Sequence, residues 1–160
     1  MERERGVFEL RTPEDLLEKL RFDLKRLEND PLDQYAAFGF FVSASHMPDW
    51  LTPGLDSAAK AKRAEMRDSE LLLQICDHIA NGSKHFQALA PRHESVSRTE
   101  RHYGGFSREF SGEFDISELT VHLQGTAAAQ MGESMDAVDL AKLVLQYWEK
   151  ELPRRRATAT

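Results

Sequence analysis

The chain of 160 residues lacks several features that would assign a function at once. It has one cysteine, Cys76, so it cannot form an internal disulfide, and this thiol lies in an apolar pattern that fits a reducing compartment. It contains no Walker-type loop, no Gly-x-Gly-x-x-Gly, no Cys-x-x-Cys and no nucleophile elbow. These absences argue against nucleotide-dependent and thiol chemistry.

Long apolar segments are missing as well. No run of 18 apolar residues occurs, which predicts that nothing spans a membrane. The start of the chain, Met1–Arg5, is charged and has no apolar segment behind it, so we expect no signal peptide. The sequence therefore predicts a cytoplasmic protein.

The charge balance is acidic overall but basic in one region. The chain has 21 basic and 27 acidic residues and a net charge of -6, which argues against a general role in coating DNA. Basic residues nevertheless gather in residues 84–108, namely Lys84, Arg92, Arg98, Arg101 and Arg108. The same stretch holds His85, His93 and His102. Glu94, Glu100 and Glu109 lie among or beside these residues, so the sequence leaves room for a local basic patch.

Apolar periodicity predicts five helices, over residues 12–29, 33–47, 55–67, 69–85 and 134–152. The second helix has almost no polar face, so we expect it to be buried nearly all round. Pro48 cannot donate to the carbonyl of Ala44, which predicts that this helix kinks or ends there.

The segments between the helices give a second kind of pattern. Residues 87–102 are expected to form a long loop. Leu119, Val121 and Leu123 alternate with polar residues, which predicts a β-hairpin within residues 103–125. The predicted fold is mainly α, a bundle of four or five helices with a small β-hairpin inserted between the last two. Residues 1–152 would form one domain, and residues 153–160 a disordered basic tail.

The fourth helix carries an unusual polar stripe. Gln74, His78, Asn81 and His85 are spaced 4-3-4, which places them within one narrow sector of the helix. A solvated face usually carries Lys and Glu instead. Gly82, Lys84 and His85 also suit the end of a helix, so a helix C-cap is the alternative interpretation. That alternative does not explain Asn81.

The stretch Ile79–His85, Ile-Ala-Asn-Gly-Ser-Lys-His, resembles the signature of the HEPN superfamily. These are small helical-bundle proteins, often dimeric, and many are ribonucleases in toxin–antitoxin and antiviral systems. Their motif is an Arg, then a polar residue such as Asn, then a His about one turn later. Asn81 and His85 match, whereas the arginine position holds Ala80. The region also resembles a set of uncharacterised bacterial and phage proteins.

The HEPN resemblance implies roles for individual residues. If the chain cleaves RNA, His85 would be the acid or base and Asn81 would orient it. Lys84, with a loop arginine such as Arg92 or Arg98, would stabilise the phosphate in place of the missing arginine. The resemblance also implies a homodimer and RNA or a cognate protein as the partner.

A second candidate site is His46 with Asp49, beside Pro48. Three residues apart, they could share a helical face, pair, and meet the polar stripe if the two helices pack together. The alternative is that His46 simply has an ordinary hydrogen-bond partner at a helix end and that Asp49 caps the next turn.

A metal site would need histidines closer together than those of the polar stripe. His78 and His85 lie seven residues apart, about 10 Å along a helix. Because this is too far to share one ion, no metal and no cofactor are expected, and a metal-dependent hydrolase is the most distant alternative.

The basic stretch is interleaved with the aromatic residues Tyr103, Phe106 and Phe110. Such a pattern favours single-stranded nucleic acid, through phosphate contacts and base stacking, although the aromatic residues could instead form the hairpin's core. The candidate contacts are Arg92, Arg98, Arg101 and Arg108. The leading hypothesis is a HEPN-like protein that binds RNA or a partner protein in a toxin–antitoxin or phage-defence system. The rival hypothesis is a non-catalytic interaction module, such as an antitoxin or immunity-like subunit.

Overall fold

The computed structural model describes residues 6–85, 92–105 and 117–158, with the side chains of 83–85 left out. This part of the chain forms helices and one small sheet. The elements in order are α1 (Pro13–Asn29), α2 (Gln34–Leu51), α3 (Ser57–Ser69), α4 (Leu71–His85), β1 (Val96–His102), β2 (Glu118–Leu123), α5 (Gly125–Met131), β3 (Ser134–Asp136) and α6 (Ala137–Ala157). The prediction of a mainly helical chain is confirmed. The described part has six helices rather than four or five, and three strands rather than a hairpin.

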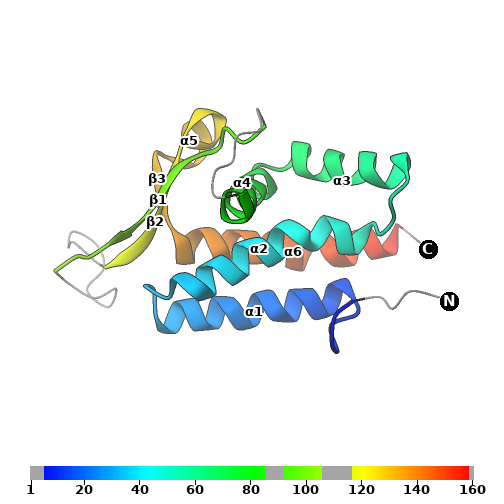
Figure 1. Cartoon of the computed structure of the whole chain (residues 1–160), viewed down its shortest axis with the longest axis horizontal. Helices are drawn as coiled ribbons and strands as arrows, with labels where there is room; N and C mark the ends of the chain where they lie inside the picture. Colours follow the sequence, from blue (N-terminus) through cyan, green and yellow to red (C-terminus); the bar gives the residue numbers. More distant parts are fainter. Residues whose placement is uncertain (1–5, 86–91, 106–116, 159–160) are drawn as a thin grey trace.

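α1, α2 and α6 run side by side along the long axis of the molecule, and α4 crosses them (Figure 1). α1 packs against α2 and α6, and α2 packs against α4. α1 begins at a capping box, in which Thr12 accepts from the backbone of Asp15 and the Asp15 carboxylate accepts from the backbone of Thr12. Its leucine stripe is buried at Leu16, Leu20 and Leu27. The helical layer therefore forms around apolar stripes at helical spacing.

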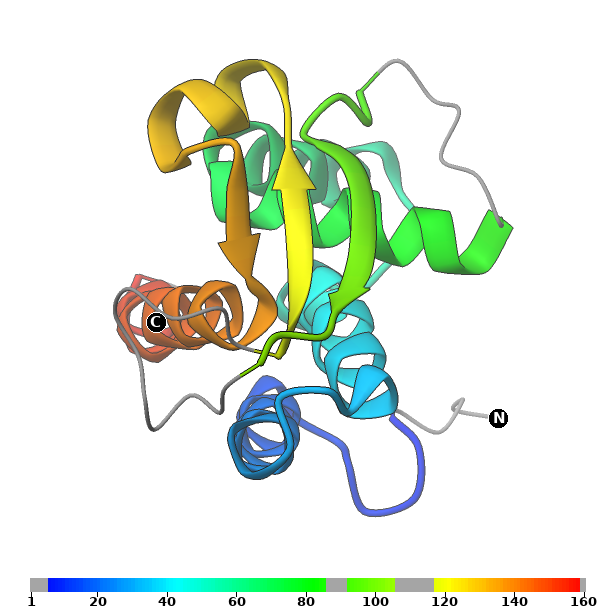
Figure 2. The ribbon, with the colours of Figure 1, turned by 90° about the vertical axis from the view of Figure 1, so that its left-hand side faces the viewer.

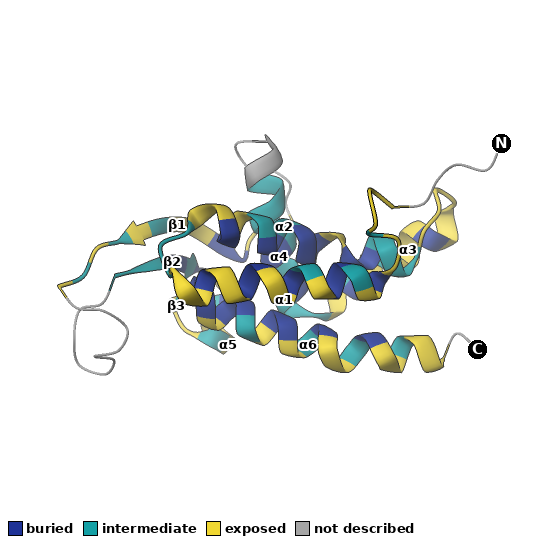
Figure 3. Ribbon diagram, turned by 90° about the horizontal axis from the view of Figure 1, so that it is seen from below, coloured by how far each residue is buried: buried dark blue, intermediate teal, exposed yellow. Residues whose placement is uncertain are grey.

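α2 is buried on one side only, which corrects the expectation of burial all round. Phe40 and Phe41 are in the core, where their rings meet edge to face at 5.4 Å. Tyr35 and Phe38 are 77% and 55% exposed. An apolar composition cannot distinguish these two sides, because it gives every face of the helix the same preference for burial. The chain thus presents aromatic surface on a helix that otherwise belongs to the core. Figure 3 shows the same division into buried and exposed faces along the outer helices.

α2 does not end at Pro48, although its predicted bounds were residues 33–47. The helix continues to Leu51, and Thr52 donates its backbone N–H to the carbonyl of Pro48. Met47 and Pro48 are buried, and Asp49 is bound by α3. These tertiary contacts stabilise the last turn and offset the hydrogen bond that Pro48 cannot make.

The sheet is antiparallel in the order β1-β2-β3 (Figure 2). The strand predicted around Leu119–Leu123 is present as β2, but its partner β1 lies in the segment expected to be a loop. β1 is an edge strand whose residues are mostly exposed, so it lacks the alternation that marks a half-buried strand. Residues 106–116 of the predicted hairpin lie outside the described residues. β3 occupies the first residues of the helix predicted over residues 134–152, so α6 begins later, and α5 lies before β3.

The end of α6 also differs from expectation. Residues 153–157, expected to belong to a disordered tail, continue the helix. Arg156 explains this, because its Nε and Nη2 donate to Glu14 on α1 at 3.0 and 2.9 Å. At its other end α6 is capped by Asp136, which accepts from the backbone of Val138 and Asp139. None of the described helices is long and apolar enough to cross a membrane.

Candidate functional site

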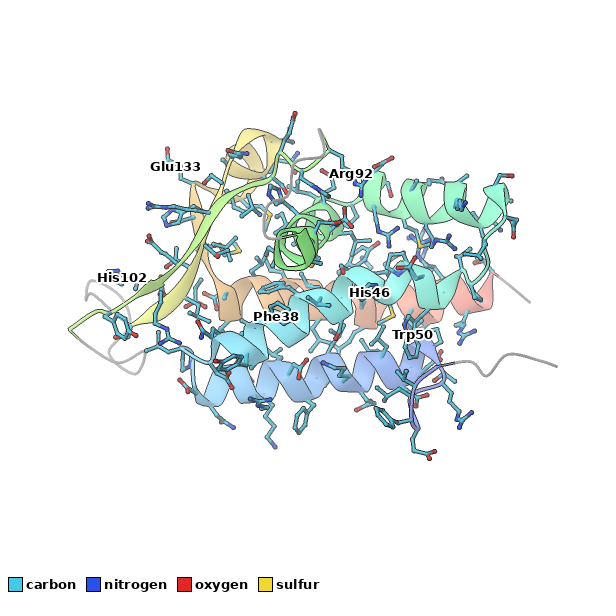
Figure 4. All side chains as sticks on the ribbon, viewed as in Figure 1. Phe38, His46, Trp50, Arg92, His102 and Glu133 are labelled. Atoms are coloured by element: carbon cyan, nitrogen blue, oxygen red, sulfur yellow. The ribbon has the colours of Figure 1, made fainter. Side chains whose placement is uncertain are left out.

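A cleft of about 860 Å³ lies between α2, α3 and α4, and we call it the α3 cleft. It brings together residues that the sequence analysis proposed separately. Its charged and polar lining is Ser45, His46, Asp49, Lys60, Arg63, Arg67, Asp68, Asp77, Asn81 and Arg92. In Figure 4, Phe38 and His46 lie along α2, and Arg92 lies above them in the view, near α3. The His46–Asp49 pair and one residue of the polar stripe, Asn81, therefore line the same cleft.

His46 and Asp49 form the predicted pair on one face of α2. His46 Nδ1 lies 3.5 Å from Asp49 Oδ2, and the His46 ring is exposed to the cleft. Asp49 does not cap a following turn, because α2 continues beyond it. Its carboxylate instead receives Arg63 Nε at 3.2 Å and Arg67 Nη2 at 2.9 Å from α3. The pair is thus fixed from two helices.

The electrostatic surroundings keep Asp49 ionised. Desolvation alone would raise the pKa of Asp49, but the close contact of His46 and the charges of Arg67 and Arg63 outweigh it and lower the pKa. A carboxylate that stays ionised at neutral pH holds the imidazole of His46 in one orientation.

Asp77 on α4 joins the floor of the cleft to the segment before β1. His93 Nε2 lies 3.0 Å from its carboxylate, and Arg92 Nε lies 3.3 Å away. Asn81 donates its amide to the Asp77 side chain at 3.1 Å and to the Asp77 carbonyl at 2.8 Å. His93 is 9% exposed, so this contact anchors the chain where it enters β1. Asp77 was not among the sequence candidates.

The polar stripe of α4 does not face a single cleft. Gln74 donates to the carbonyl of Asp68 at 2.9 Å, and His78 Nδ1 accepts from the backbone N–H of Val96 at 3.2 Å. Asn81 reaches the α3 cleft, with its amide committed to Asp77. α4 packs against both α3 and β1, so Gln74 bonds to α3 and His78 to β1. Lys84 and His85 end α4, but their side chains lie outside the described residues, so their predicted roles stay predictions.

The four cations of the α3 cleft divide into two kinds. Arg63 and Arg67 are largely buried and hold the backbone: Arg63 donates to the carbonyls of Thr52 and Gly54 at 2.6 and 3.0 Å, and Arg67 to that of Ser45 at 3.3 Å. Lys60 and Arg92 are exposed. The cleft therefore has two largely buried cations, Arg63 and Arg67, that are fixed by Asp49. It also has two exposed cations, Lys60 and Arg92, which an anionic ligand can reach and which we call the rim cations.

The other predicted arginines lie elsewhere. Arg98 and Arg101 are on β1, beside a second hollow of about 620 Å³ that we call the β1 groove, between β1, α2 and α4. Arg98 pairs with Glu100 at 3.3 Å on the strand. Arg101 donates to the carbonyl of Leu32 at 3.0 Å and to the hydroxyl of Tyr103 at 2.9 Å. Arg108 lies outside the described residues.

The site contains cations that the sequence analysis missed. Lys60, Arg63 and Arg67 follow one another at 3-4 spacing, which places them on one face of α3. That spacing was a usable signal within the helix predicted over residues 55–67. Within the described part of the chain, no group of three or more His, Cys, Asp or Glu side chains could hold a metal ion.

Comparison of the chain with protein-family models, with curated proteins and with solved structures finds no match. The functional argument therefore depends on the geometry of the two hollows.

Proposed function

We propose that this chain is a HEPN-like protein that binds single-stranded RNA in the α3 cleft. The observation that carries the proposal is the shared lining of the cleft. Four cationic and three acidic side chains line it, so the cleft is net basic in a chain whose net charge is -6, and two of the cations bind Asp49. Cations concentrated on one side of an acidic protein favour a polyanionic ligand at that side.

The rim cations are the expected phosphate contacts. Lys60 and Arg92 are exposed at the cleft, where Arg92 also contacts Asp77, whereas Arg63 and Arg67 are largely buried and held by Asp49. Phe38 also lines the cleft and is 55% exposed, so it offers a ring on which a base can stack. Phosphate contact and stacking together are how proteins bind single strands without reading a long sequence.

The test is fluorescence anisotropy with a labelled oligouridylate. Lys60→Gln with Arg92→Gln should weaken binding and reduce the slope of log K against log salt by roughly 1.4, since each phosphate contact on a single strand contributes about 0.7. Lys62→Gln is the matched control, because Lys62 is exposed on the same helix but does not line the cleft. Equal affinities and slopes for the double variant and the control would refute the proposal.

RNA cleavage is a separate question about the same cleft. His46 is the described histidine that lines it, and Asp49 orients the ring. His85 is the histidine that the HEPN resemblance implies. Cleavage of the oligouridylate by wild type, His46→Ala and His85→Ala would assign the acid or base to one of them. Equal cleavage by all three, or cleavage by none, would leave binding as the function.

The exposed aromatic residues of α2 favour a second candidate, a protein-interaction module. Tyr35 is 77% exposed and lies one turn from Phe38, and exposed aromatic side chains are enriched at interfaces. The partner could be a cognate protein or a second copy of the chain. Sedimentation velocity of wild type and Tyr35→Ser tests the second copy: a dimer that dissociates on this substitution supports it, and a monomer in both removes it.

A further inference from the structure

The β1 groove has the size and lining of a ligand site. Its volume of about 620 Å³ falls within the range of about 300–1,000 Å³ that proteins use for small organic ligands. α2 contributes Phe38 and Phe41 to one wall, and β1 contributes the polar run Ser97–Arg101 to the other. An apolar wall opposite a few polar groups is the usual arrangement around a planar polar ligand.

Phe38 connects this groove to the α3 cleft. It lines both hollows, and about half of its surface is exposed. A strand whose phosphates bind Lys60 and Arg92 would pass this ring, because Phe38 borders the cleft in which those cations lie. The Phe38 ring therefore lies between the cleft that would hold the phosphates and the groove beside β1. A base next to those phosphates can stack on this ring from the side of the groove.

His78 supplies a hydrogen-bond donor to the same groove. Its Nδ1 accepts from the backbone N–H of Val96 at 3.2 Å, so in the neutral ring the proton is on Nε2. Burial, together with the charge of the nearby His93, lowers the pKa of His78 and favours this neutral form. Among the described residues nothing bonds Nε2, and His78 lines the groove. The ring can thus donate to a ligand that carries an acceptor.

We infer that the β1 groove is the subsite for an unpaired base of the bound RNA. The base stacks on Phe38, and an acceptor on its edge receives Nε2–H of His78. This inference rests on the proposed function, because the α3 cleft holds the phosphates that bring the base to Phe38. Every RNA base has a ring face and an edge acceptor, so the subsite is expected to accept a base without strong sequence preference.

The experiment compares a labelled oligouridylate with an abasic strand of the same length and backbone. Wild type should bind the intact strand more tightly, by roughly 5- to 150-fold, as expected for one stacked base. Phe38→Ala should lower affinity for the intact strand to nearly that of the abasic strand, and Phe38→Trp should restore it. Phe22→Ala is the matched control, since Phe22 is an exposed aromatic residue on α1 that lines neither hollow.

A nuclear magnetic resonance titration tests the donor without removing it. The ¹⁵N signal of His78 Nε2 should shift when the intact strand binds and stay in place when the abasic strand binds. This readout needs no substitution at His78, whose loss would leave the Val96 N–H unpaired.

The outcomes separate this inference from the proposed function. If both strands bind wild type equally, and Lys60→Gln with Arg92→Gln weakens both, the α3 cleft stands and the base subsite is refuted. If neither strand binds, both proposals fail. If free uridine monophosphate binds as tightly as the intact strand, the groove is a nucleotide site and its assignment to RNA is refuted.

Discussion

Substitution of Asp77 by alanine should destabilise the fold far more than loss of another carboxylate at the same cleft. Asp77 is 14% exposed in its side chain and lies 3.0 Å from His93 and 3.7 Å from Arg67. Its removal leaves the buried His93 without its carboxylate and the Asn81 amide without one acceptor, whereas Arg67 keeps Asp49. A buried polar group left unpaired costs about 1–3 kcal/mol. The exposed Arg92 contact adds less than about 1 kcal/mol. Because the site is partly solvated, we expect a loss of about 2–4 kcal/mol.

Urea unfolding and thermal unfolding followed by circular dichroism measure this loss. For a chain of this size the expected fall in Tm is about 5–15 °C. Asp68→Ala is the control, because Asp68 is exposed at the same cleft and no described residue bonds its carboxylate. It should change stability by no more than about 0.5 kcal/mol. If Asp77→Ala and Asp68→Ala have equal effects, the Asp77 contacts do not anchor the segment before β1.

Three further measurements test the core and the electrostatics. Phe40→Ala should cost about 3–5 kcal/mol of unfolding free energy and the neighbouring Phe38→Ala less than about 1 kcal/mol, because only Phe40 is buried; similar losses in urea unfolding would contradict the one-sided burial of α2. The fold lowers the pKa of Asp49 from its ordinary value of 3.8, so the stability from Asp49 is complete above that value and is lost as the pH falls through the lowered pKa. The stability difference between wild type and Asp49→Asn should therefore be constant well above pH 3.8 and shrink as the pH falls below that value, and a difference that stays constant there would argue against it. Burial raises the pKa of the Cys76 thiol, so a thiol-reactive disulfide reagent should modify Cys76 only after unfolding, and fast reaction of the native chain would contradict its burial.

The helices were predictable where a stripe of apolar residues meets a clear end signal. Thr12 and the leucines of α1 give both, and α1 begins one residue after Thr12. Pro48 and Pro153 misled the interpretation, because a proline's local cost is visible in the sequence whereas the contacts that offset it are not. Asp49 with Arg67, and Arg156 with Glu14, are pairings between residues 18 or more positions apart.

β1 was missed for a related reason. It is stabilised as a strand by β2 beside it, and its own residues are mostly exposed. An edge strand of this kind has little hydrophobic pattern, because only one of its residues, Val96, is buried. β2 was found because Val121 and Leu123 are both buried.

The candidate site was predictable in its members more than in its connections. His46, Asp49, Asn81 and Arg92 were proposed from separate local patterns, and the structure places all four on one cleft. That Asp77 binds the Asn81 amide is a consequence of side-chain conformation, which helical spacing does not determine. Spacing assigns a residue to a face of its helix, whereas packing decides what that face meets.

Cross-linking of bound RNA tests the central claim most directly. A 4-thiouridine-containing oligouridylate is bound to the wild-type chain and irradiated, and the cross-linked peptides are identified by mass spectrometry. We expect the cross-links on the lining of the α3 cleft and the β1 groove, with Phe38 among them and with fewer in the Lys60→Gln, Arg92→Gln variant. Cross-links confined to α1 and α6, or cross-links that the double variant leaves unchanged, would contradict the claim that this chain binds RNA in the α3 cleft.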